Sequence, residues 1–445
     1  ELVSTDTPVS SISELDGKES ITVETPSSVQ TAYYKAGKLP APYLHLNSKL
    51  YRELEQKVHY YSKSFKTPRM DEDATVILAF DGIDYTSRVW VNGTFTGEHQ
   101  GMFGGPSIRI DSLLRHDGGE NQVTVEVRSA NYNFPEYDSH VPHNFVRSWF
   151  FSKSREGVTP FFHLGMWNGA RLEVLPHYHI ERPFLATKSI GGGKAVIGFS
   201  TEIFCGTNSK DYTLHPWTGG QGRALRSGVE VNKNIKVTVR LSDNGRVAYE
   251  KVFTPKVIEG RCWMEETFEL NNPKLWYPNQ MGNPDIYQAS VVMSVNGEQV
   301  DEVDFDFGVR TIGHERSAGI RVADRWNDWQ FVVNGEKMFV KGMNWMPLDA
   351  LSDMPYENYD WVLRAARDMG IQMIRIWGTG FLETEKFYDC CNKYGIMVWQ
   401  DFTIANFDTP EWPQDVWEAQ VCQNIFRLRN QPSLAVWGGG NEFNP

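Results

Sequence analysis

Hydrophobic and polar residues alternate in many short stretches between about residues 60 and 307, whereas the first 45 residues have only weak periodicity. In the stretch from Asn121 to Arg128, for example, Val123, Val125 and Val127 alternate with polar residues. A period of two is typical of a β-strand with one buried face. The same pattern, bounded by Gly, Asn and Pro, predicts further strands at Tyr60–Phe65, Thr75–Phe80, Arg88–Val91, Ala195–Phe204, Val229–Leu241, Gly245–Phe253, Trp263–Leu270, Tyr287–Val295 and Glu302–Phe307.

From about residue 335 the pattern changes to short apolar runs separated by helical stretches. An apolar run followed by a helix is the repeating unit of a parallel sheet whose strands are buried on both faces. We therefore predict four βα-type strands whose carboxyl ends meet on one side. The predicted strands are Lys337–Trp345, Met373–Trp377, Ile396–Trp399 and Leu434–Trp437, and the predicted helices are Tyr359–Met369, Glu383–Lys393 and Asp415–Arg429.

Each of these predicted strands ends in a Trp and a polar group. The groups are Asn344 with Trp345, Arg375 with Trp377, Trp399 with Asp401, and Trp437 with Asn441 and Glu442. Because the strand ends converge, we expect these side chains to form one site. Aromatic rings stack on the apolar faces of sugars, and a carboxyl group can protonate a glycosidic oxygen. For any single Trp, ordinary packing in the barrel is as plausible a role as contact with a sugar. For Arg375, a structural salt bridge is the alternative to a role in the site.

Four motifs occur in an order that is specific to one family. They are Phe339 to Trp345, Ile374 to Gly378, Gly395 to Phe402, and Arg429 to Ser433 leading into Gly440-Asn441-Glu442. This run resembles the first half of the catalytic barrel of glycoside hydrolase family 2, nearest to its β-mannosidase-like branch. The resemblance implies that Glu442 is the general acid/base and that Asn441 binds the sugar 2-hydroxyl. The other substrate-binding candidates are Arg375, Trp377, Trp399, Asp401, Asn344 and Trp345.

The earlier part of the chain resembles the same family. Trp90 to Gly93, together with the glycine-rich stretch Gly101 to Pro106, resembles the family's jelly-roll sugar-binding domain, and Asn271 to Pro278 resembles a turn in its immunoglobulin-like domain. The predicted fold class is multidomain, β plus α/β. We expect a jelly-roll β-sandwich over residues 1–182, an immunoglobulin-like β-sandwich over 183–312, and the first half of a (β/α)8 TIM barrel over 313–445.

One departure from the family concerns the sugar. In β-mannosidases the loop before the last jelly-roll strand carries a Trp-Asp-Trp signature, and the matching stretch Ser154 to Pro160 lacks it. A β-mannoside, β-galactoside, β-glucuronide or β-glucosaminide therefore remains open as substrate. Nearby side chains that could replace the signature are Arg147, Trp149, Arg155, Glu156 and His163.

A second departure concerns the nucleophile, which in this family comes from a later barrel strand. Four strands do not close an eight-stranded barrel. We therefore expect no nucleophile among these residues, an inactive 445-residue chain, and a missing half barrel supplied by a continuation, a separate fragment or a paired chain. Two functions compete. The chain is the N-terminal portion of an exo-acting retaining β-glycosidase, or it is a non-catalytic carbohydrate-binding or assembly fragment.

Composition excludes several other classes. The net charge is −12 and no basic run occurs, which argues against a nucleic-acid partner. No apolar run approaches the roughly 20 residues of a membrane span. We expect no disulfide framework, metal site or cofactor, because the cysteines lack such spacing: Cys205, Cys262, Cys390, Cys391 and Cys422. The chain begins at Glu1 rather than Met, which favours an exported protein whose leader was removed, or an engineered start.

Overall fold

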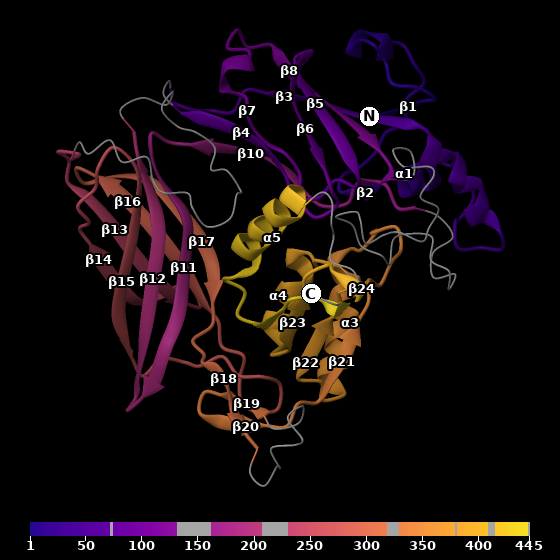
Figure 1. Cartoon of the computed structure of the whole chain (residues 1–445). Helices are drawn as coiled ribbons and strands as arrows, with labels where there is room; N and C mark the ends of the chain where they lie inside the picture. Colours follow the sequence, from indigo (N-terminus) through magenta and orange to yellow (C-terminus); the bar gives the residue numbers. More distant parts are fainter. Residues whose placement is uncertain are drawn as a thin grey trace.

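The structure is a computed structural model that describes residues 1–71, 74–130, 162–206, 230–317, 329–378, 381–407 and 414–443. Figure 1 shows two β-rich parts, one formed by the indigo-to-magenta start of the chain and one by its magenta-to-orange middle. The orange-to-yellow end of the chain lies beside both of them and combines strands with helices. The helix α5 (Gln414–Leu428) reaches up from this end toward the first β-rich part.

The first part of the chain consists of two antiparallel sheets that share one hydrophobic core. Val76 and Leu78 of one sheet pack there with Val89, Val125 and Val127 of the other, as alternation predicts for a β-sandwich. The larger sheet has the order β1 (Leu2–Thr5), β3 (Val58–Lys66), β8 (Glu120–Arg128), β5 (Thr86–Val91), β6 (Thr94–Gln100), and the smaller β10 (Ala170–Leu175), β4 (Thr75–Phe80), β7 (Ser107–Arg109).

Shorter elements surround this sandwich. The N-terminal residues, which have weak periodicity, form an edge strand, a helix and turns rather than a sheet of their own. Ser28 caps the helix α1, because its side chain accepts a hydrogen bond from the Thr31 backbone. The elements are β2 (Ser27–Ser28), β9 (Gly165–Met166), α1 (Val29–Lys35) and the 3-10 helices η1 (Ile12–Leu15), η2 (Asn47–Gln56) and η3 (Asp111–Leu113).

The middle of the chain forms a second sandwich with its own core. Ile197 and Phe199 from one sheet pack against Val237, Val239 and Val291 from the other. The strand predicted over Val229–Leu241 begins only at Ile235, and residue 229 lies outside the described residues. One sheet has the order β11 (Tyr178–Gly191), β12 (Lys194–Cys205), β15 (Gly260–Asn271), and the other β14 (Arg246–Phe253), β13 (Ile235–Asp243), β16 (Tyr287–Val295), β17 (Glu298–Phe307).

A small antiparallel sheet precedes the α/β part. It has the order β18 (Ile312–Arg316), β19 (Trp329–Val333), β20 (Glu336–Met338). The single strand predicted over Lys337–Trp345 is therefore wrong. Its beginning pairs with β19 in a hairpin, and only β21 (Gly342–Trp345) joins the parallel sheet. Phe339, between the two strands, is 88% exposed.

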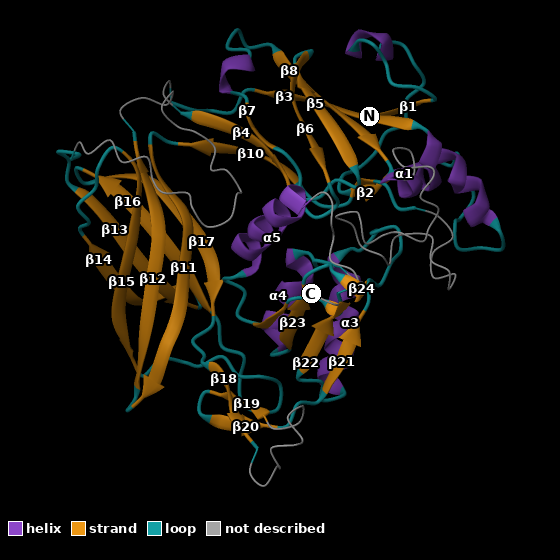
Figure 2. Ribbon diagram, in the orientation of Figure 1, coloured by secondary structure: helices purple, strands orange, loops and turns teal. Residues whose placement is uncertain are grey.

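The predicted consecutive parallel strands are present (Figure 2). Their sheet has the order β21, β22 (Met373–Ile376), β23 (Met397–Asp401), β25 (Leu434–Gly438). The helices α3 (Tyr356–Asp368), α4 (Glu385–Tyr394) and α5 pack on one face, where Ile374, Ile376 and Val398 meet Leu363 and Phe387. Arg375, Trp399 and Asp401 therefore lie on the opposite face, because successive side chains in a strand alternate.

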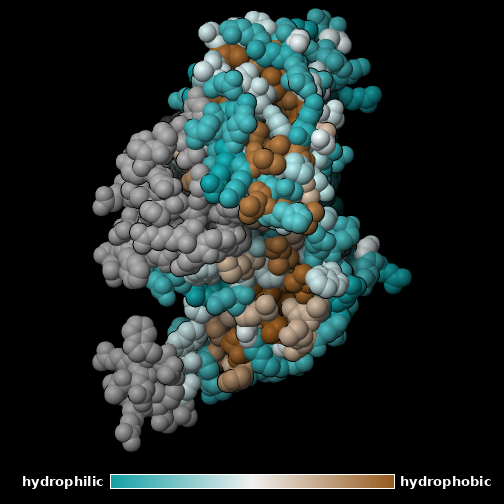
Figure 3. All heavy atoms as spheres, turned by 90° about the vertical axis from the view of Figure 1, so that its right-hand side faces the viewer, coloured by the Kyte–Doolittle hydropathy of each residue, from teal (hydrophilic) through white to brown (hydrophobic). Residues whose placement is uncertain are grey.

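The strand β21 pairs with β22 alone within the described residues. Hydrophobic side chains also remain exposed in and just before β21, and on and just after α3: Phe339 88%, Met343 44%, Trp361 66% and Met369 80%. Figure 3, which views the molecule from the side of β21 and α3, shows hydrophobic side chains gathered on its lower half. Exposed strand edges and apolar patches of this kind are usually covered by further structure.

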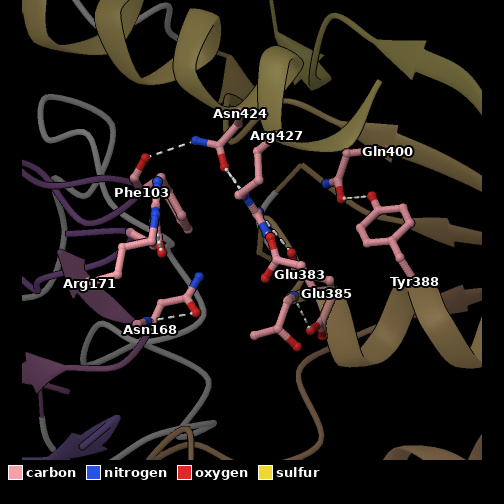
Figure 4. A network of polar contacts seen from close by, with 12 residues as sticks. Phe103, Asn168, Arg171, Glu383, Glu385, Tyr388, Gln400, Asn424 and Arg427 are labelled. Carbon is pink, nitrogen blue, oxygen red and sulfur yellow. Dashed lines mark hydrogen bonds and ion pairs between the residues drawn. The ribbon is translucent and has the colours of Figure 1, made fainter. Parts of the chain in front are cut away.

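The helix α5 contacts the first sandwich through buried amides (Figure 4). The Phe103 backbone N–H donates to Gln420 Oε1 at 2.7 Å, and Asn424 Nδ2 donates to the Phe103 carbonyl at 2.8 Å. Gly101 has a φ of +112°, and a Cβ there would lie 1.9 Å from Gln420 Nε2. Glycine is thus required in the predicted glycine-rich stretch, because the helix approaches its backbone too closely for a side chain.

Within the described part of the chain, no helix is long and apolar enough to cross a membrane.

Candidate active site

Three of the predicted site residues lie in direct contact at the carboxyl ends of the parallel strands. Arg375 Nη2 on β22 donates to Asp401 Oδ2 on β23 at 2.5 Å and to Asn441 Oδ1 at 3.1 Å. The Asp401 carboxylate is 1% exposed, whereas the Arg375 side chain is 31% exposed. The guanidinium therefore holds one carboxylate and one amide oxygen together from neighbouring strands.

Two glycines make room for this arrangement. The Gly378 backbone N–H, just beyond β22, donates to Asp401 Oδ2 at 3.1 Å, and a Cβ on Gly378 would lie 2.9 Å from the Asn441 nitrogen. A Cβ on Gly438, at the end of β25, would lie 2.0 Å from Asp401 Oδ1. Glycine occurs at both positions because the Ile404 and Asn441 backbone at Gly378, and the Asp401 side chain at Gly438, occupy the space that a Cβ would fill.

Burial raises the pKa of the Asp401 carboxyl above its ordinary value, and hydrogen bonding and charge attraction from Arg375 oppose that shift. A buried carboxylate is tolerated when a cation and backbone donors surround it. Arg375 and the Gly378 N–H therefore both bind the Asp401 carboxylate within the site.

Asn441 and Glu442 lie in the short strand β26 (Asn441–Phe443), which pairs in parallel with β24 (Ala405–Phe407). The Asn441 N–H donates to the Ile404 carbonyl at 2.8 Å, so the backbone that carries the Asn441 amide is fixed. Glu442 is exposed and has a φ of +48°. A left-handed conformation is uncommon for Glu, and such backbone strain is often found at functional sites.

Three further predicted residues lie on or near the same face. The Arg375 guanidinium lies 5.7 Å from the centroid of the Trp399 ring. Asn344 is exposed and is the register partner of Arg375 in the neighbouring strand. Trp377 follows β22 directly and is half-buried.

Trp345 does not lie on the face that carries Arg375 and Asp401. It is 2% exposed and packs against Phe387 and Tyr359 on the helix-covered face of the sheet. The register explains the difference, because Trp345 pairs with Ile376, whose side chain also faces the helices. We therefore leave Trp345 out of the site. Trp437 likewise stacks on Phe402, with ring centroids 5.1 Å apart.

A carboxylate that the sequence did not single out lies behind the site. Trp345 Nε1 and the Tyr359 hydroxyl each donate to a Glu383 carboxylate oxygen at 2.8 Å. Burial raises the pKa of Glu383, and these two hydrogen bonds oppose the shift. Arg427 of α5 reaches the same segment, donating to the Glu383 carbonyl and to Glu385 Oε1 at 2.8 Å (Figure 4). No motif spacing in the sequence pointed to this cluster.

Of the residues considered as replacements for the Trp-Asp-Trp signature, Arg147, Trp149, Arg155 and Glu156 lie outside the described residues. His163 is fully buried, and its Nδ1 lies 3.1 Å from Asp84 Oδ2. Asp349, an acidic residue in the loop after β21, accepts hydrogen bonds from the Tyr43 hydroxyl and the Leu351 backbone. In the described ranges, no three His, Cys, Asp or Glu side chains are grouped so that they could hold a metal ion.

Replacement of Arg375 by Met is expected to destabilise the α/β part by about 2–3 kcal/mol at pH 7, because it leaves the Asp401 carboxylate buried without its cation. A raised folded-state pKa means that protonated Asp401 favours the folded state. That contribution is present at low pH and is lost as the pH rises. The deficit of the variant should therefore shrink between pH 7 and pH 4, as measured by urea unfolding.

The matched control for this experiment is Arg364→Met on α3. Arg364 is 51% exposed, and its guanidinium lies 3.7 Å from the Asp360 carboxylate. The substitution therefore removes one cation without leaving a carboxylate buried. Its loss should cost less than about 1 kcal/mol at both pH values. A deficit of Arg375→Met that is equal at pH 7 and pH 4 would show that Asp401 does not depend on this cation.

The fold and site define a class of protein: two β-sandwiches followed by an α/β part with polar side chains at its strand tips. Comparison with protein-family models matches residues 11–159 to the glycosyl hydrolase 2 galactose-binding domain-like family and residues 223–310 to glycosyl hydrolases family 2. The chain belongs to glycoside hydrolase family 2 and is similar to its β-mannosidase-like branch.

Curated relatives include the β-mannosidase B of Emericella nidulans, 28% identical over 438 residues, and that of Aspergillus niger, 26% identical over 436 residues. Each alignment covers 94% of this chain and 47% of the relative, so the chain spans about half the length of the curated relatives it matches.

Solved structures share the fold. The β-D-mannosidase from Dictyoglomus thermophilum matches with a TM-score of 0.79 and 24% identity, over 99% of this chain and 52% of that chain. The exo-chitosanase CsxA from Amycolatopsis orientalis matches with a TM-score of 0.72 and 17% identity, over 98% of this chain and 48% of that chain.

Proposed function

We propose that this chain supplies part of the active site of an exo-acting retaining β-glycosidase that removes terminal β-linked sugars. The observation that carries the proposal is the contact of Arg375 with Asp401 and Asn441 at the strand tips, directly beside Glu442. A sugar-binding site needs fixed polar groups of this kind next to its acid. The relatives that are named β-mannosidases make a β-mannoside the first substrate to test.

The residues take distinct roles in this proposal. Glu442 donates a proton to the departing glycosidic oxygen and later removes one from the attacking water. Asn441 binds the sugar 2-hydroxyl through its amide, because Arg375 occupies the Asn441 Oδ1 atom and leaves the Nδ2 group to donate. Trp377, Trp399 and Asn344 line the sugar pocket. No cofactor is needed, because proton transfer and a carboxylate nucleophile suffice for this reaction.

We also propose that the parallel sheet is the first half of a (β/α)8 barrel. Two observations support it. One edge of β21 pairs with no other strand among the described residues, and the described helices leave uncovered the sheet face that carries Arg375. The other half, in a longer protein, would bring a nucleophile to within about 5.5 Å of Glu442. The domain limits near residues 182 and 312 remain part of this proposal.

The test of the acid/base role uses Glu442→Ala in the full-length protein with an aryl β-mannoside that has a good leaving group. Azide needs no general base, so it should restore turnover and yield the β-glycosyl azide, identified by NMR. Glu357→Ala, an exposed carboxylate on α3, is the matched control and should neither lose activity nor respond to azide. An α-azide, or no rescue of an otherwise folded variant, would contradict the assignment.

A further inference from the structure

The first sandwich holds a residue of the α/β part in an aromatic socket, formed by Met102, Phe103 and Trp167. Phe381 enters this socket, with its ring centroid 4.4 Å from that of Trp167 and 5.9 Å from that of Phe103. Phe381, the neighbouring Leu382 and the three socket residues are all 3% exposed or less. The contact therefore joins two segments far apart in the chain in one closed hydrophobic cluster.

The socket is itself fixed in position. Trp167 Nε1 donates to the Met102 carbonyl at 2.8 Å, and the ring lies so close to Gly82 that a Cβ there would be 2.4 Å from it. Asn424 of α5 binds the Phe103 carbonyl, as Figure 4 shows. Phe381 thus packs against a rigid surface, on which its position is well defined.

The Phe381 backbone is tied to the strand that carries Asp401. Gln400 Nε2 donates to the Phe381 carbonyl at 3.0 Å and to the Asp401 carbonyl at 2.8 Å. Gln400 Oε1 in turn accepts from the Tyr388 hydroxyl at 2.9 Å, which fixes the orientation of the amide (Figure 4). A shift of Phe381 would therefore break a buried hydrogen bond beside Asp401.

Phe381 also closely follows Gly378 in the chain. The Gly378 N–H binds Asp401, and a Cβ on Gly378 would lie 2.9 Å from the Asn441 nitrogen. Phe381 is three residues from Gly378 in the sequence, and Gly378 meets both polar residues of the candidate site.

We propose that the aromatic socket is a positioning device: the first sandwich holds Phe381, and Phe381 sets the segment at Gly378 that places Asn441 for the sugar 2-hydroxyl. The inference rests on the proposed function. Phe381 touches no substrate in this scheme, so it is a positioning residue that acts through Asn441. When a mutation away from the reacting atoms misplaces a substrate-binding group by about 1 Å, the rate can fall about 100-fold.

The experiment compares Phe381→Leu with the unchanged full-length protein on an aryl β-mannoside and on its 2-deoxy analogue. Leu keeps the cluster apolar but cannot fill the space between Trp167 and Phe103. We expect kcat/KM on the intact sugar to fall about 10- to 100-fold. On the 2-deoxy sugar the fall should be much smaller, because that substrate has no 2-hydroxyl for Asn441 to bind.

Two controls separate the possible failures. Asn441→Ala should likewise lose much more activity on the intact sugar than on the 2-deoxy sugar. If it does not, the proposed role of Asn441 is wrong, whichever result the socket variants give. Phe253→Leu, which removes a stacked ring from the core of the second sandwich, should leave both rates unchanged. If Asn441→Ala discriminates between the substrates while Phe381→Leu lowers both equally, the socket is only structural and the inference fails.

Phe103→Leu changes the socket from the other side and must give the same pattern as Phe381→Leu. It replaces Phe381→Leu as the deciding variant if that protein does not fold, as judged by its thermal unfolding. A Phe103→Leu protein with unchanged kinetics on both sugars would also overturn the inference.

Discussion

Glu442→Gln in the full-length protein is expected to lower kcat/KM roughly 100- to 10,000-fold on glycosides with poor leaving groups, such as a natural disaccharide. On an activated aryl glycoside, for example a dinitrophenyl glycoside, the loss should be tenfold or less. The physical reason is that a poor leaving group departs only when it is protonated, whereas a dinitrophenolate departs without a proton. The measurement is the dependence of log(kcat/KM) on the pKa of the leaving group.

Glu442 is exposed in this structure, so the substitution removes no buried contact and should leave the thermal unfolding unchanged. Glu357→Gln on α3 serves again as the matched surface control. Equal losses on all leaving groups would show that Glu442 does not donate the proton, and the acid would have to be sought elsewhere.

The 445-residue chain assayed by itself is expected to show no turnover that depends on Glu442. A retaining mechanism needs a second carboxylate about 5–5.5 Å from the acid, free to attack the sugar. At the neighbouring strand tip the acidic side chain is Asp401, but Arg375 and the Gly378 N–H both bind its Oδ2 atom. Asp349 is engaged by Tyr43 and by backbone donors.

The assay uses a panel of aryl β-glycosides with the purified chain, then repeats it with Glu442→Ala and Asp401→Asn. A rate above the uncatalysed background that disappears in both variants would make Asp401 the nucleophile and the chain self-sufficient. Turnover that survives both variants would come from a contaminating enzyme.

Hydrophobic period predicts the parallel strands and their helices well, because these strands are short apolar runs and the helices α3 and α4 each bury one apolar face. The prediction placed the third helix at Asp415–Arg429, within a residue of α5 at Gln414–Leu428. Three polar residues at the ends of consecutive strands were expected to converge, and Arg375, Asp401 and Asn441 are in contact. The catalytic roles assigned to this site stay predictions.

Details that depend on partners distant in sequence could not be predicted. Which face Trp345 takes is set by its pairing with Ile376 and by Glu383, and neither is visible from spacing along the chain. Similarly, Lys337 pairs with Val332 in a hairpin, although its own segment reads as the start of a longer strand. The socket for Phe381 brings together three segments, so no local pattern marks it.

The amide-lined contact between α5 and the first sandwich also bears on the order of folding. Gln420 and Asn424 are 2% and 3% exposed, and each binds the backbone of Phe103. During synthesis the first sandwich leaves the ribosome long before α5, and domains generally fold as they emerge. The first sandwich is therefore already folded when α5 docks against it. The segment that leads to Glu442 is then positioned by a surface some three hundred residues earlier in the chain.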